Sequence, residues 1–412
     1  MINMTDKMNN NDTIWKKLLF ITTILLLSTL VNAQKVDIKA VFSDAEKQTD
    51  VMIKEVPAAR NGKANLVSPR TVDANGQLVL SPSFRWTSGF FPGELWYLYA
   101  YTGNKKWEEQ ARIFTDNIKR EQFNGGTHDM GFKMYCSYGN GYLLTKDEMY
   151  KKILLQSAKT LSTRFNNTVG CFRSWDTMPK FTFPVIIDNM LNLELMFEAT
   201  KLSGDSMYYK MAVSHANTTM KNHFRKDYSC YHVVDYDSTK SGNIIKKVTH
   251  QGYADESAWA RGQAWAIYGF TMCYRETKDP KYLKQAENVA GYILNNPTLP
   301  ADLVPYWDFN APNIPNEPRD ASAAACMASG LYELSTYSKK GNIYRMAADK
   351  MMESLTHNYR STIGENRGFI LLHSTGAKPH NSEVDAPLPY ADYYYLEALL
   401  RAKKLKEGKK LF

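Results

Sequence analysis

The chain has 412 residues, of which 44% are hydrophobic and 23% charged, and its formal net charge is +9. The length allows a large core in one or two domains, and the composition is typical of a soluble globular protein. No run of Lys or Arg supports nucleic-acid binding, so the positive charge instead favours acidic glycans as partners.

The first 33 residues are predicted to be a signal peptide. Two lysines precede an apolar run over residues 18–31, and Val31–Ala33 is a small-residue cleavage site. The run is too short for a membrane span, and no comparable run follows. Residues 34–412 are therefore expected to be exported to the periplasm, free of the membrane after cleavage behind Ala33. The possible start codons are Met1, Met4 and Met8.

A short turn that recurs along the chain predicts helices with one polar and one apolar face. Each copy is a turn followed by an aromatic residue, and in four of the five copies an Ala stands four residues later, which is helical spacing. A sixth helix of this type is expected near residues 43–55. The five turns begin at Thr102, Thr145, Ser203, Thr277 and Lys340.

More apolar helices are expected between these amphipathic ones. Their predicted ranges are 88–101, 129–144, 186–201, 257–275, 321–337 and 390–403. Six helices of each kind in alternation predict an all-α (α/α)6 barrel with the apolar helices inside. The long connections would all lie at the N-termini of the inner helices, on the face where sites are usually built. No linker interrupts this pattern, so residues 34–412 are predicted to be a single domain.

Two aspartates at that face are the first candidates for catalysis. Asp129 follows His128, and Asp188 follows the apolar residues 183–187. One interpretation is that each carboxylate caps its helix. Alternatively, a carboxyl in apolar surroundings near a second carboxylate keeps its proton to higher pH, as a general acid requires. Two carboxyls across a barrel mouth would suit glycoside cleavage.

Aromatic and basic side chains near the same face are candidates for substrate binding. Trp86 and Phe90 lie four residues apart at the start of the first inner helix, either as a sugar platform or as core. Arg261 and Trp265 have the same spacing. An Arg on an otherwise apolar helix needs an acidic partner, which is either a structural Asp or a substrate carboxylate. The long loop before this helix adds His232 and Gln251.

Several kinds of chemistry have no motif in the chain. It has no P-loop, no dinucleotide-binding glycine pattern, no nucleophile elbow and no zinc-ligand spacing. Acid–base chemistry without a cofactor or metal is the remaining expectation. The five cysteines are odd in number and show no disulfide spacing, so they are predicted to be core thiols, with at most one incidental bridge.

Four segments, in this order, together resemble the unsaturated glucuronyl hydrolases. They are His128–Phe132, Ile187–Leu193, Trp259–Trp265 and Ala391–Leu399. The resemblance covers about residues 86–401 and implies an (α/α)6 barrel. It also implies removal of the terminal 4,5-unsaturated glucuronic acid from oligosaccharides that polysaccharide lyases release, of the glycosaminoglycan type. The implied reaction is hydration of the C4=C5 double bond, without a cofactor.

The resemblance further implies roles for individual residues. Asp188 matches the acid/base that protonates C4 and activates the water that adds at C5, and Asp129 matches the supporting carboxylate. Positions that line the unsaturated-sugar subsite are matched by Trp86, Phe90, His128, His232, Gln251, Arg261 and Trp265. Some relatives that take sulfated substrates carry a Ser/Lys cluster before the last helix. Here Ser374 and Lys378 have a different spacing, which leaves the sulfate preference open.

Three alternatives stand beside this hypothesis. An unsaturated rhamnogalacturonyl hydrolase on the same scaffold would act on pectin fragments. A non-catalytic glycan-binding module would need no proton donor. A sugar epimerase on an (α/α)6 barrel would need paired histidines at the mouth, whereas only His128 is well placed there. The sequence leaves linkage preference and oligomeric state open.

Overall fold

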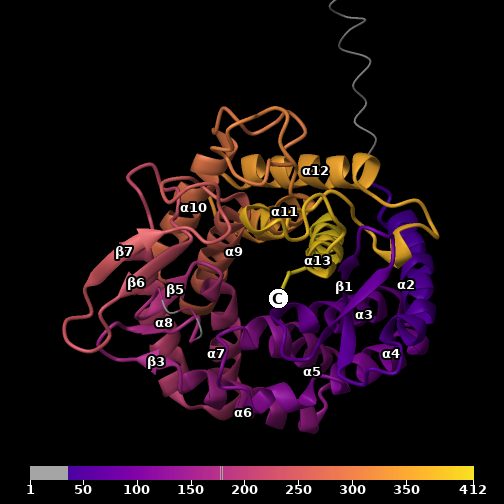
Figure 1. Cartoon of the computed structure of the whole chain (residues 1–412), viewed down its shortest axis with the longest axis horizontal. Coiled ribbons are helices and arrows are strands. Elements are labelled where there is room, and N and C mark those ends of the chain that lie inside the picture. Colours follow the sequence, from indigo (N-terminus) through magenta and orange to yellow (C-terminus); the bar gives the residue numbers. More distant parts are fainter. Residues whose placement is uncertain (1–35, 177, 179) are drawn as a thin grey trace, which may run out of the picture. The chain divides into compact units, whose positions relative to one another are not determined.

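Two concentric layers of helices make up most of the structure, a computed structural model that describes residues 36–176, 178 and 180–412 (Figure 1). The expected signal peptide lies outside these residues. The outer helices are α2 (Ile38–Arg60), α4 (Lys105–Asp116), α6 (Glu148–Ser162), α8 (Ser206–Asn222), α10 (Pro280–Leu294) and α12 (Gly341–Asn358). The inner elements are α3 (Phe90–Thr102), η3 with α5 (Gly131–Gly139 and Asn140–Thr145), α7 (Asn189–Ser203), α9 (Ala260–Thr277), α11 (Ala321–Ser335) and α13 (Pro389–Lys406).

The inner elements form a closed ring within the compact unit Asp37–Phe412. Each packs against the next along the chain, and α13 packs against α3 to complete the circle (Figure 1). Inner helices such as α11 are buried on nearly every side, whereas the outer helices bury one face. The predicted (α/α)6 barrel is therefore confirmed.

The recurring turn joins each of four inner elements to the outer helix that follows it. In the first copy, Gly103 ends α3 in the left-handed region (φ 67°), and the Asn104 side chain accepts a hydrogen bond from the Lys106 N–H to cap α4. The hydroxyl of Thr102 accepts from the Asn104 N–H at 3.1 Å. The same left-handed residue recurs at Lys146, Gly204 and Lys278. Each of these four copies of the turn thus ends one helix and caps the next within three residues, as Thr102, Gly103 and Asn104 do in the first copy.

Two inner elements begin differently from the prediction. The range 129–144 opens with the π-helix η3 rather than an α-helix. In its first turn, the Phe132 N–H donates to the side-chain oxygen of Asn192 at 3.0 Å. Gly131 permits this approach, since a Cβ there would lie 2.5 Å from the Asn192 Cα. The range 186–201 becomes helical only at Asn189, because a strand precedes it.

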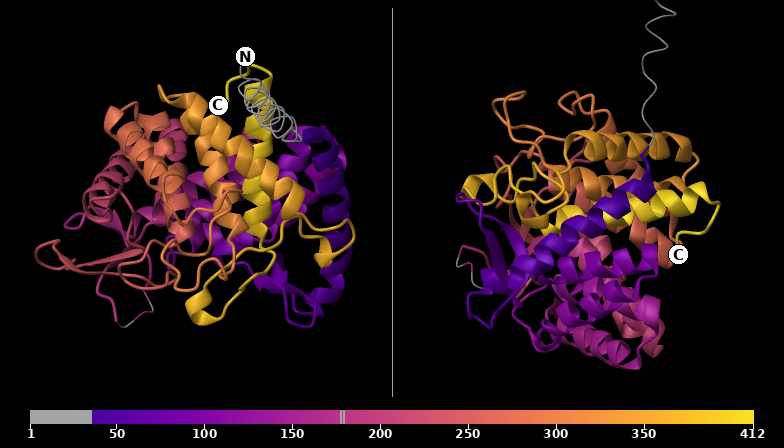
Figure 2. Two further views of the ribbon diagram at one scale, coloured as in Figure 1. Left: turned by 90° about the horizontal axis from the view of Figure 1, so that it is seen from above. Right: turned by 90° about the vertical axis from the view of Figure 1, so that its right-hand side faces the viewer.

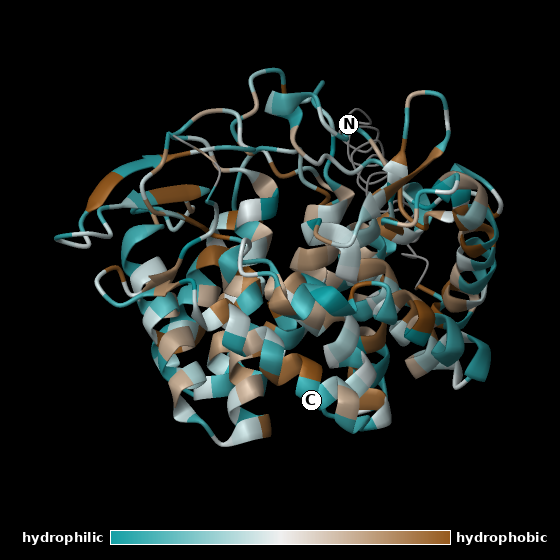
Figure 3. Cartoon of the chain, turned by 60° about the horizontal axis from the view of Figure 1, so that its bottom comes forward, coloured by the Kyte–Doolittle hydropathy of each residue, from teal (hydrophilic) through white to brown (hydrophobic). Residues whose placement is uncertain are grey.

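Short antiparallel strands occupy the long connections, which the sequence patterns did not predict. They form the hairpin β1 (Leu66–Val72) and β2 (Leu78–Pro82), the pair β3 (Phe165–Asn166) and β4 (Cys171–Phe172), and the sheet β5 (Pro184–Ile186), β6 (Val233–Tyr236) and β7 (Ile244–Val248). The strands and loops gather at one end of the helices (Figures 2 and 3). Since β5 pairs with β6, two connections that are distant in sequence form one wall.

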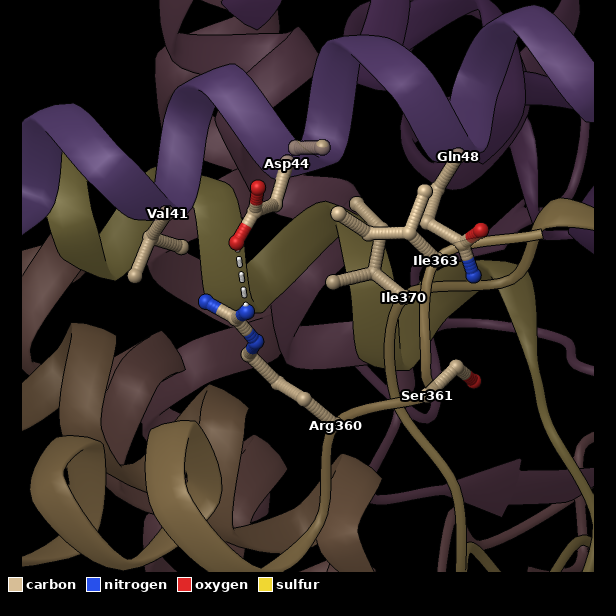
Figure 4. Close-up of a pocket in the computed structure, with 8 residues that line it drawn as sticks. Val41, Asp44, Gln48, Arg360, Ser361, Ile363 and Ile370 are labelled. Atoms are coloured by element: carbon tan, nitrogen blue, oxygen red, sulfur yellow. Dashed lines mark hydrogen bonds and ion pairs between the residues drawn. The ribbon is translucent and has the colours of Figure 1, made fainter. Parts of the chain in front are cut away.

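The segment before α13 is tied to the first outer helix, around a very small pocket (Figure 4). Asp44 of α2 pairs with Arg360 at 2.8 Å. The side chain of Gln48 donates to the Phe369 carbonyl at 2.8 Å and accepts from the Gly364 N–H at 2.7 Å. These contacts join the last part of the ring to the first.

The C-terminal ends of the inner helices enclose buried ion pairs. Arg275 pairs with Glu194 and with Glu333, the latter at 3.0 Å, and Arg401 pairs with Glu333 at 3.2 Å. All five cysteines are buried and unbridged, so the prediction of core thiols is confirmed. Across the described residues, no helix has the length and apolar character that crossing a membrane requires.

Candidate active site

A cavity of about 330 Å³ is lined by residues at the N-termini of several inner helices and in the loops that precede them. Its lining includes six of the nine predicted site residues, namely Trp86, His128, Asp129, Asp188, Gln251 and Arg261. The full lining runs from Arg70 to Tyr390, so the structure brings together residues that span more than half of the chain.

Asp188 stands at the N-terminus of α7, but its carboxylate caps no N–H group of that helix. Its Oδ2 atom is buried and has no hydrogen-bond partner in the described part of the chain. Burial raises the pKa of Asp188 to about 7, the nearby charge of Arg261 opposes this rise, and the charge of Asp129 adds to it. The helix-cap interpretation is wrong for Asp188, and the carboxyl is suited to hold a proton near neutrality.

Trp265 lies behind Asp188 rather than in the wall of the cavity. Its indole group is among those that lower the pKa of Asp188, although neither Trp265 Nε1 nor Asp188 Oδ2 has a well-formed hydrogen bond to a described residue. The Trp265 ring packs on Phe132 with ring centroids 5.2 Å apart. This side chain is fully buried and supports the floor of the site.

His232 faces Asp188 from the start of the β5–β6 wall. Its Nε2 lies 3.6 Å from Asp188 Oδ2. Its Nδ1 accepts hydrogen bonds from the backbone N–H groups of His250 and Gln251, both at 3.1 Å. Burial holds the pKa of His232 well below its ordinary value, so the ring is neutral.

Asp129 and His128 form the opposite part of the site. Asp129 Oδ2 accepts from the Thr127 hydroxyl at 2.8 Å, and Oδ1 lies 3.3 Å from His128 Nε2. The residue at the cap position of the following helix is Met130, so Asp129 does not serve as that cap. Burial lowers the pKa of His128, and the Asp129 charge opposes that effect.

Arg261 has a structural acid as its partner, as the first of the two interpretations of this residue expects. Its guanidinium pairs with Asp320 at 2.7 Å and donates to the carbonyls of Thr375 and Gly376. It also stacks over Trp259, 4.5 Å from the ring centroid. Arg261 still lines the cavity, so its charge acts on the site while its geometry is fixed by the protein.

The two aromatic residues at the first inner helix have different positions. Trp86 is half-buried and lines the cavity, whereas Phe90 is fully buried beneath it, edge-to-face at 5.6 Å. Phe90, Trp265 and His232 are thus absent from the lining and support residues that belong to it. A platform for a sugar ring is compatible with Trp86 but not with Phe90.

Several lining residues carried no recognisable signal in the sequence. They are Arg70, Arg85, Trp175, Met178, Ile186, His250, Gly376, Ala377, His380, Ser382, Glu383 and Tyr390. Most come from loops or from the β1–β2 hairpin, where the sequence pattern does not indicate which way a side chain points. Tyr390 directly precedes the last motif, Ala391–Leu399, so its place in the sequence could have indicated that it belongs to the site.

Ser374 and Lys378 do not form an anion site in the cavity. Lys378 pairs with the buried Glu317 and lies 5.3 Å from the Trp307 ring centroid. Ser374 is fully buried, and neither residue lines the cavity. Among the described residues, no group of three or more His, Cys, Asp or Glu is arranged to hold a metal ion.

The fold and the site have clear counterparts among known proteins. The profile of Glycosyl Hydrolase Family 88 matches residues 64–403. An unsaturated glucuronyl hydrolase from Formosa agariphila is 45% identical over 401 residues, which are 95% of this chain and 99% of that protein. An unsaturated chondroitin disaccharide hydrolase from Streptococcus pyogenes is 32% identical over 371 residues, 88% of this chain and 92% of that protein.

Solved structures agree with these sequence relatives. The crystal structure of an unsaturated glucuronyl hydrolase specific for heparin superposes with a TM-score of 0.83 at 47% identity, over 88% of this chain and 98% of that one. The unsaturated glucuronyl hydrolase of Bacillus sp. GL1 gives a TM-score of 0.81 at 31% identity, over 90% of this chain and 97% of that one.

Proposed function

The chain belongs to Glycosyl Hydrolase Family 88 and is a glycoside hydrolase, and we propose that it hydrates the C4=C5 bond of its substrate. The substrate is a glycosaminoglycan fragment with a terminal 4,5-unsaturated glucuronic acid, and the product of hydration then releases that sugar. The observation that carries the proposal is Asp188, a buried and uncapped carboxyl in a cavity, with a pKa of about 7.

The reaction needs one group that first gives and then takes a proton. Protonated Asp188 donates its proton to C4, and positive charge develops at C5 and the ring oxygen. Ionised Asp188 then accepts a proton from the water that adds at C5. The resulting hemiketal opens, and the hemiacetal at C1 that this produces releases the neighbouring sugar. One water is consumed, and Asp188 returns to its protonated state.

Asp129 and Arg261 shift the pKa of Asp188 in opposite directions. The charge of Asp129 raises the pKa of Asp188, which helps it hold the proton that it donates, and the charge of Arg261 lowers it. A carboxyl with a pKa near the working pH serves well in both directions of proton transfer. No step of this scheme requires a cofactor.

The rim of the cavity favours substrates with a further anionic group. Arg85 lines the cavity from an exposed position, and Arg70 lines it while paired with Glu383. Together with the similarity to a structure specific for heparin, this supports heparin-type fragments as the preferred substrates. The chondroitin-acting relatives make chondroitin-type fragments the second candidate.

An absorbance assay tests the proposal. Unsaturated disaccharides absorb in the ultraviolet because of the conjugated double bond, and hydration removes that band. We expect the band to disappear fastest with heparin-type disaccharides. With Asp188→Asn, most of the band should remain. Persistence of the band with every glycosaminoglycan disaccharide, together with its loss on pectin-lyase products, would establish the rhamnogalacturonyl alternative. A protein that leaves every band intact, and that binds the disaccharides equally well as the unmodified form and as Asp188→Asn, would be a glycan-binding module.

The proposal includes export to the periplasm, based on the apolar run and the cleavage site in residues 1–33. N-terminal sequencing of the protein recovered from the periplasmic fraction should begin at Gln34. A protein retained in the cytoplasm with an intact N-terminus would contradict this part of the proposal.

A further inference from the structure

We infer that His232 is a positioning residue that keeps a single neutral tautomer, with its proton on Nε2, and presents that N–H group to Asp188. The inference rests on the proposed role of Asp188 as the acid/base. It assigns to His232 a task apart from contact with the sugar, since this residue is absent from the cavity lining.

The tautomer follows from the contacts of Nδ1. Two backbone N–H groups, of His250 and Gln251, point at Nδ1 from 3.1 Å each. A backbone N–H can only donate, so Nδ1 must carry the lone pair, and the single proton of the neutral ring must then be on Nε2. Nε2 has no hydrogen-bond partner among the described residues and lies 3.6 Å from Asp188 Oδ2.

The ring has little freedom to leave this orientation. It packs on Trp259 with centroids 4.6 Å apart and the ring planes tilted by 36°, and Trp175 packs against it edge-on at 6.1 Å. The backbone holds the pair in register, because the Ile187 N–H donates to the His232 carbonyl at 3.0 Å. The hydrogen bond between the Ile187 N–H and the His232 carbonyl therefore fixes the backbone next to Asp188 relative to the backbone of His232.

The loop that supplies the two N–H groups is itself anchored. Gln251 donates from its side chain to the Gly376 carbonyl at 3.1 Å, and the ring of His380 meets the His250 carbonyl at 2.9 Å. The Tyr253 N–H donates to the buried Asp308 carboxylate at 2.9 Å. These contacts join the loop to the segment before α13 and to the connection before α11.

The charged groups around the pair keep the histidine neutral and act on the aspartate from several elements. His250, Arg261, His223 and His128 all add to the burial that lowers the pKa of His232. Asp188 is faced by Asp129 from the opposite side and by Arg261 and Trp265 from α9. Besides the Trp265 indole, the neutral donor that faces the carboxyl is His232, whose Nε2 lies 3.6 Å from Oδ2. It leaves the acid proton for Oδ1 and stabilises the ionised carboxylate after that proton has gone.

Two isosteric substitutions separate this role from simple packing. In His232→Gln, the side-chain amide nitrogen reaches the place of Nε2 and keeps a donor toward Asp188. In His232→Asn, the shorter amide oxygen keeps an acceptor for the backbone N–H groups but removes the donor that His232 presents to Oδ2. Both variants are neutral at every relevant pH, so they differ mainly in the donor.

The alkaline limb of the pH–kcat/KM profile gives the readout. Without the donor, ionisation of Asp188 becomes harder, so we expect His232→Asn to move that limb upward by about 0.5–1 pH unit and to lower kcat about tenfold. His232→Gln should leave the limb in place, with kcat within about threefold of the unmodified enzyme. Equal limbs in the unmodified enzyme and in both variants would overturn the inference.

A measurement on the unmodified protein covers the case in which a variant fails to fold. In ¹⁵N-histidine-labelled protein, the His232 ring should show an unprotonated Nδ1 and a protonated Nε2 from pH 6 to 8, assigned as the signal absent from His232→Gln. A protonated Nδ1 would overturn the inference. If the unmodified enzyme left the ultraviolet band intact, the proposed function would fail instead, so the two failures are distinguishable.

Discussion

The N-termini of α7 and α11 carry the same residue at the same position, with opposite consequences. Asp320 caps α11, accepting from the N–H groups of Ser322 at 3.1 Å and Ala323 at 3.3 Å, and it pairs with Arg261. Asp188 precedes α7 and does neither. Both are buried, so the difference lies in their partners. A carboxylate becomes available for proton transfer where the fold engages it neither in a helix cap nor in an ion pair with Arg or Lys.

Asp392, in the first turn of α13, sharpens this lesson. Burial raises its pKa to about 7, as it does for Asp188. However, Asp392 accepts from the N–H groups of Ile370 at 2.9 Å and Leu371 at 2.8 Å, and it does not line the cavity. A raised pKa therefore identifies a catalytic carboxyl only together with access to substrate and unfilled hydrogen-bonding capacity.

The largest expected effect is the loss of activity in Asp188→Asn. The rate should fall by about 10²–10⁴-fold, because an amide cannot donate the proton. The fold should survive, because the side chain caps no helix. Initial rates from the absorbance assay measure the first effect, and circular dichroism with thermal unfolding measures the second. A variant that lost its secondary structure would show that the Asp188 carboxyl is needed for folding, and its low rate would then not establish a catalytic role.

The matched substitution Asp320→Asn should act on stability. Asn remains a good helix cap, but it leaves the guanidinium of Arg261 buried without its counter-charge. Loss of one partner of a buried ion pair typically costs about 3–5 kcal/mol. We expect a decrease of that size in the free energy of unfolding, measured by urea titration. An unchanged midpoint would show that the Thr375 and Gly376 carbonyls compensate Arg261 fully.

The pH dependence of activity and stability should reflect the pKa of Asp188. Since the protonated carboxyl is the donor, kcat/KM should fall about tenfold per pH unit above pH 7. In the folded state the pKa is raised from 3.8 to about 7, so the folded protein binds more protons than the unfolded chain between these values. Stability should therefore fall as pH rises from about 4 to 7, by at most about 4 kcal/mol, and stay low above pH 7.

Asp188→Asn provides the control for that dependence. Its neutral side chain removes the cost of a buried charge, so at pH 8 it should be more stable than the unmodified protein, whereas at pH 4 the two should be similar. Thermal unfolding at the two pH values makes the comparison. Equal melting temperatures at pH 8 would contradict a buried, ionised Asp188.

A smaller effect is expected for Asp129→Asn. Removing this charge lowers the pKa of Asp188, because Asp129 is one of the groups that raise it. The alkaline limb of kcat/KM should move to lower pH, and the rate at pH 7 should drop about tenfold. A shift to higher pH would show that Asp129 acts on Asp188 in another way.

The smallest effect is expected for Lys378→Ala. The charge of Lys378 is neutralised by Glu317 and lies outside the cavity, so the ratio of rates on sulfated and unsulfated disaccharides should change less than about twofold. Arg85→Ala, which removes a charge from the cavity rim, is the contrasting variant. A large change in that ratio for Lys378→Ala would show that Ser374 and Lys378 do contribute to sulfate recognition.

Much of the barrel was predictable from the sequence, because helical periodicity and the recurring turn are local features. The predicted placement of Asp129 and Asp188 at one mouth followed from the same alternation. The state of each aspartate was not predictable, since it depends on distant partners: Asp320 meets Arg261 across 59 positions, and Trp175 reaches the site from a long connection. The β5–β6 pairing was missed for the same reason.

The most direct test of the central claim is the fate of hydrogen at C4. In D₂O, the enzyme should place one deuterium at C4 in a single configuration, because a fixed Asp188 delivers it to one face of the double bond. Nuclear magnetic resonance of the first product formed, combined with the loss of the ultraviolet band before or with sugar release, measures this. Deuterium in both configurations equally, or release of a sugar whose double bond is still intact, would contradict the account.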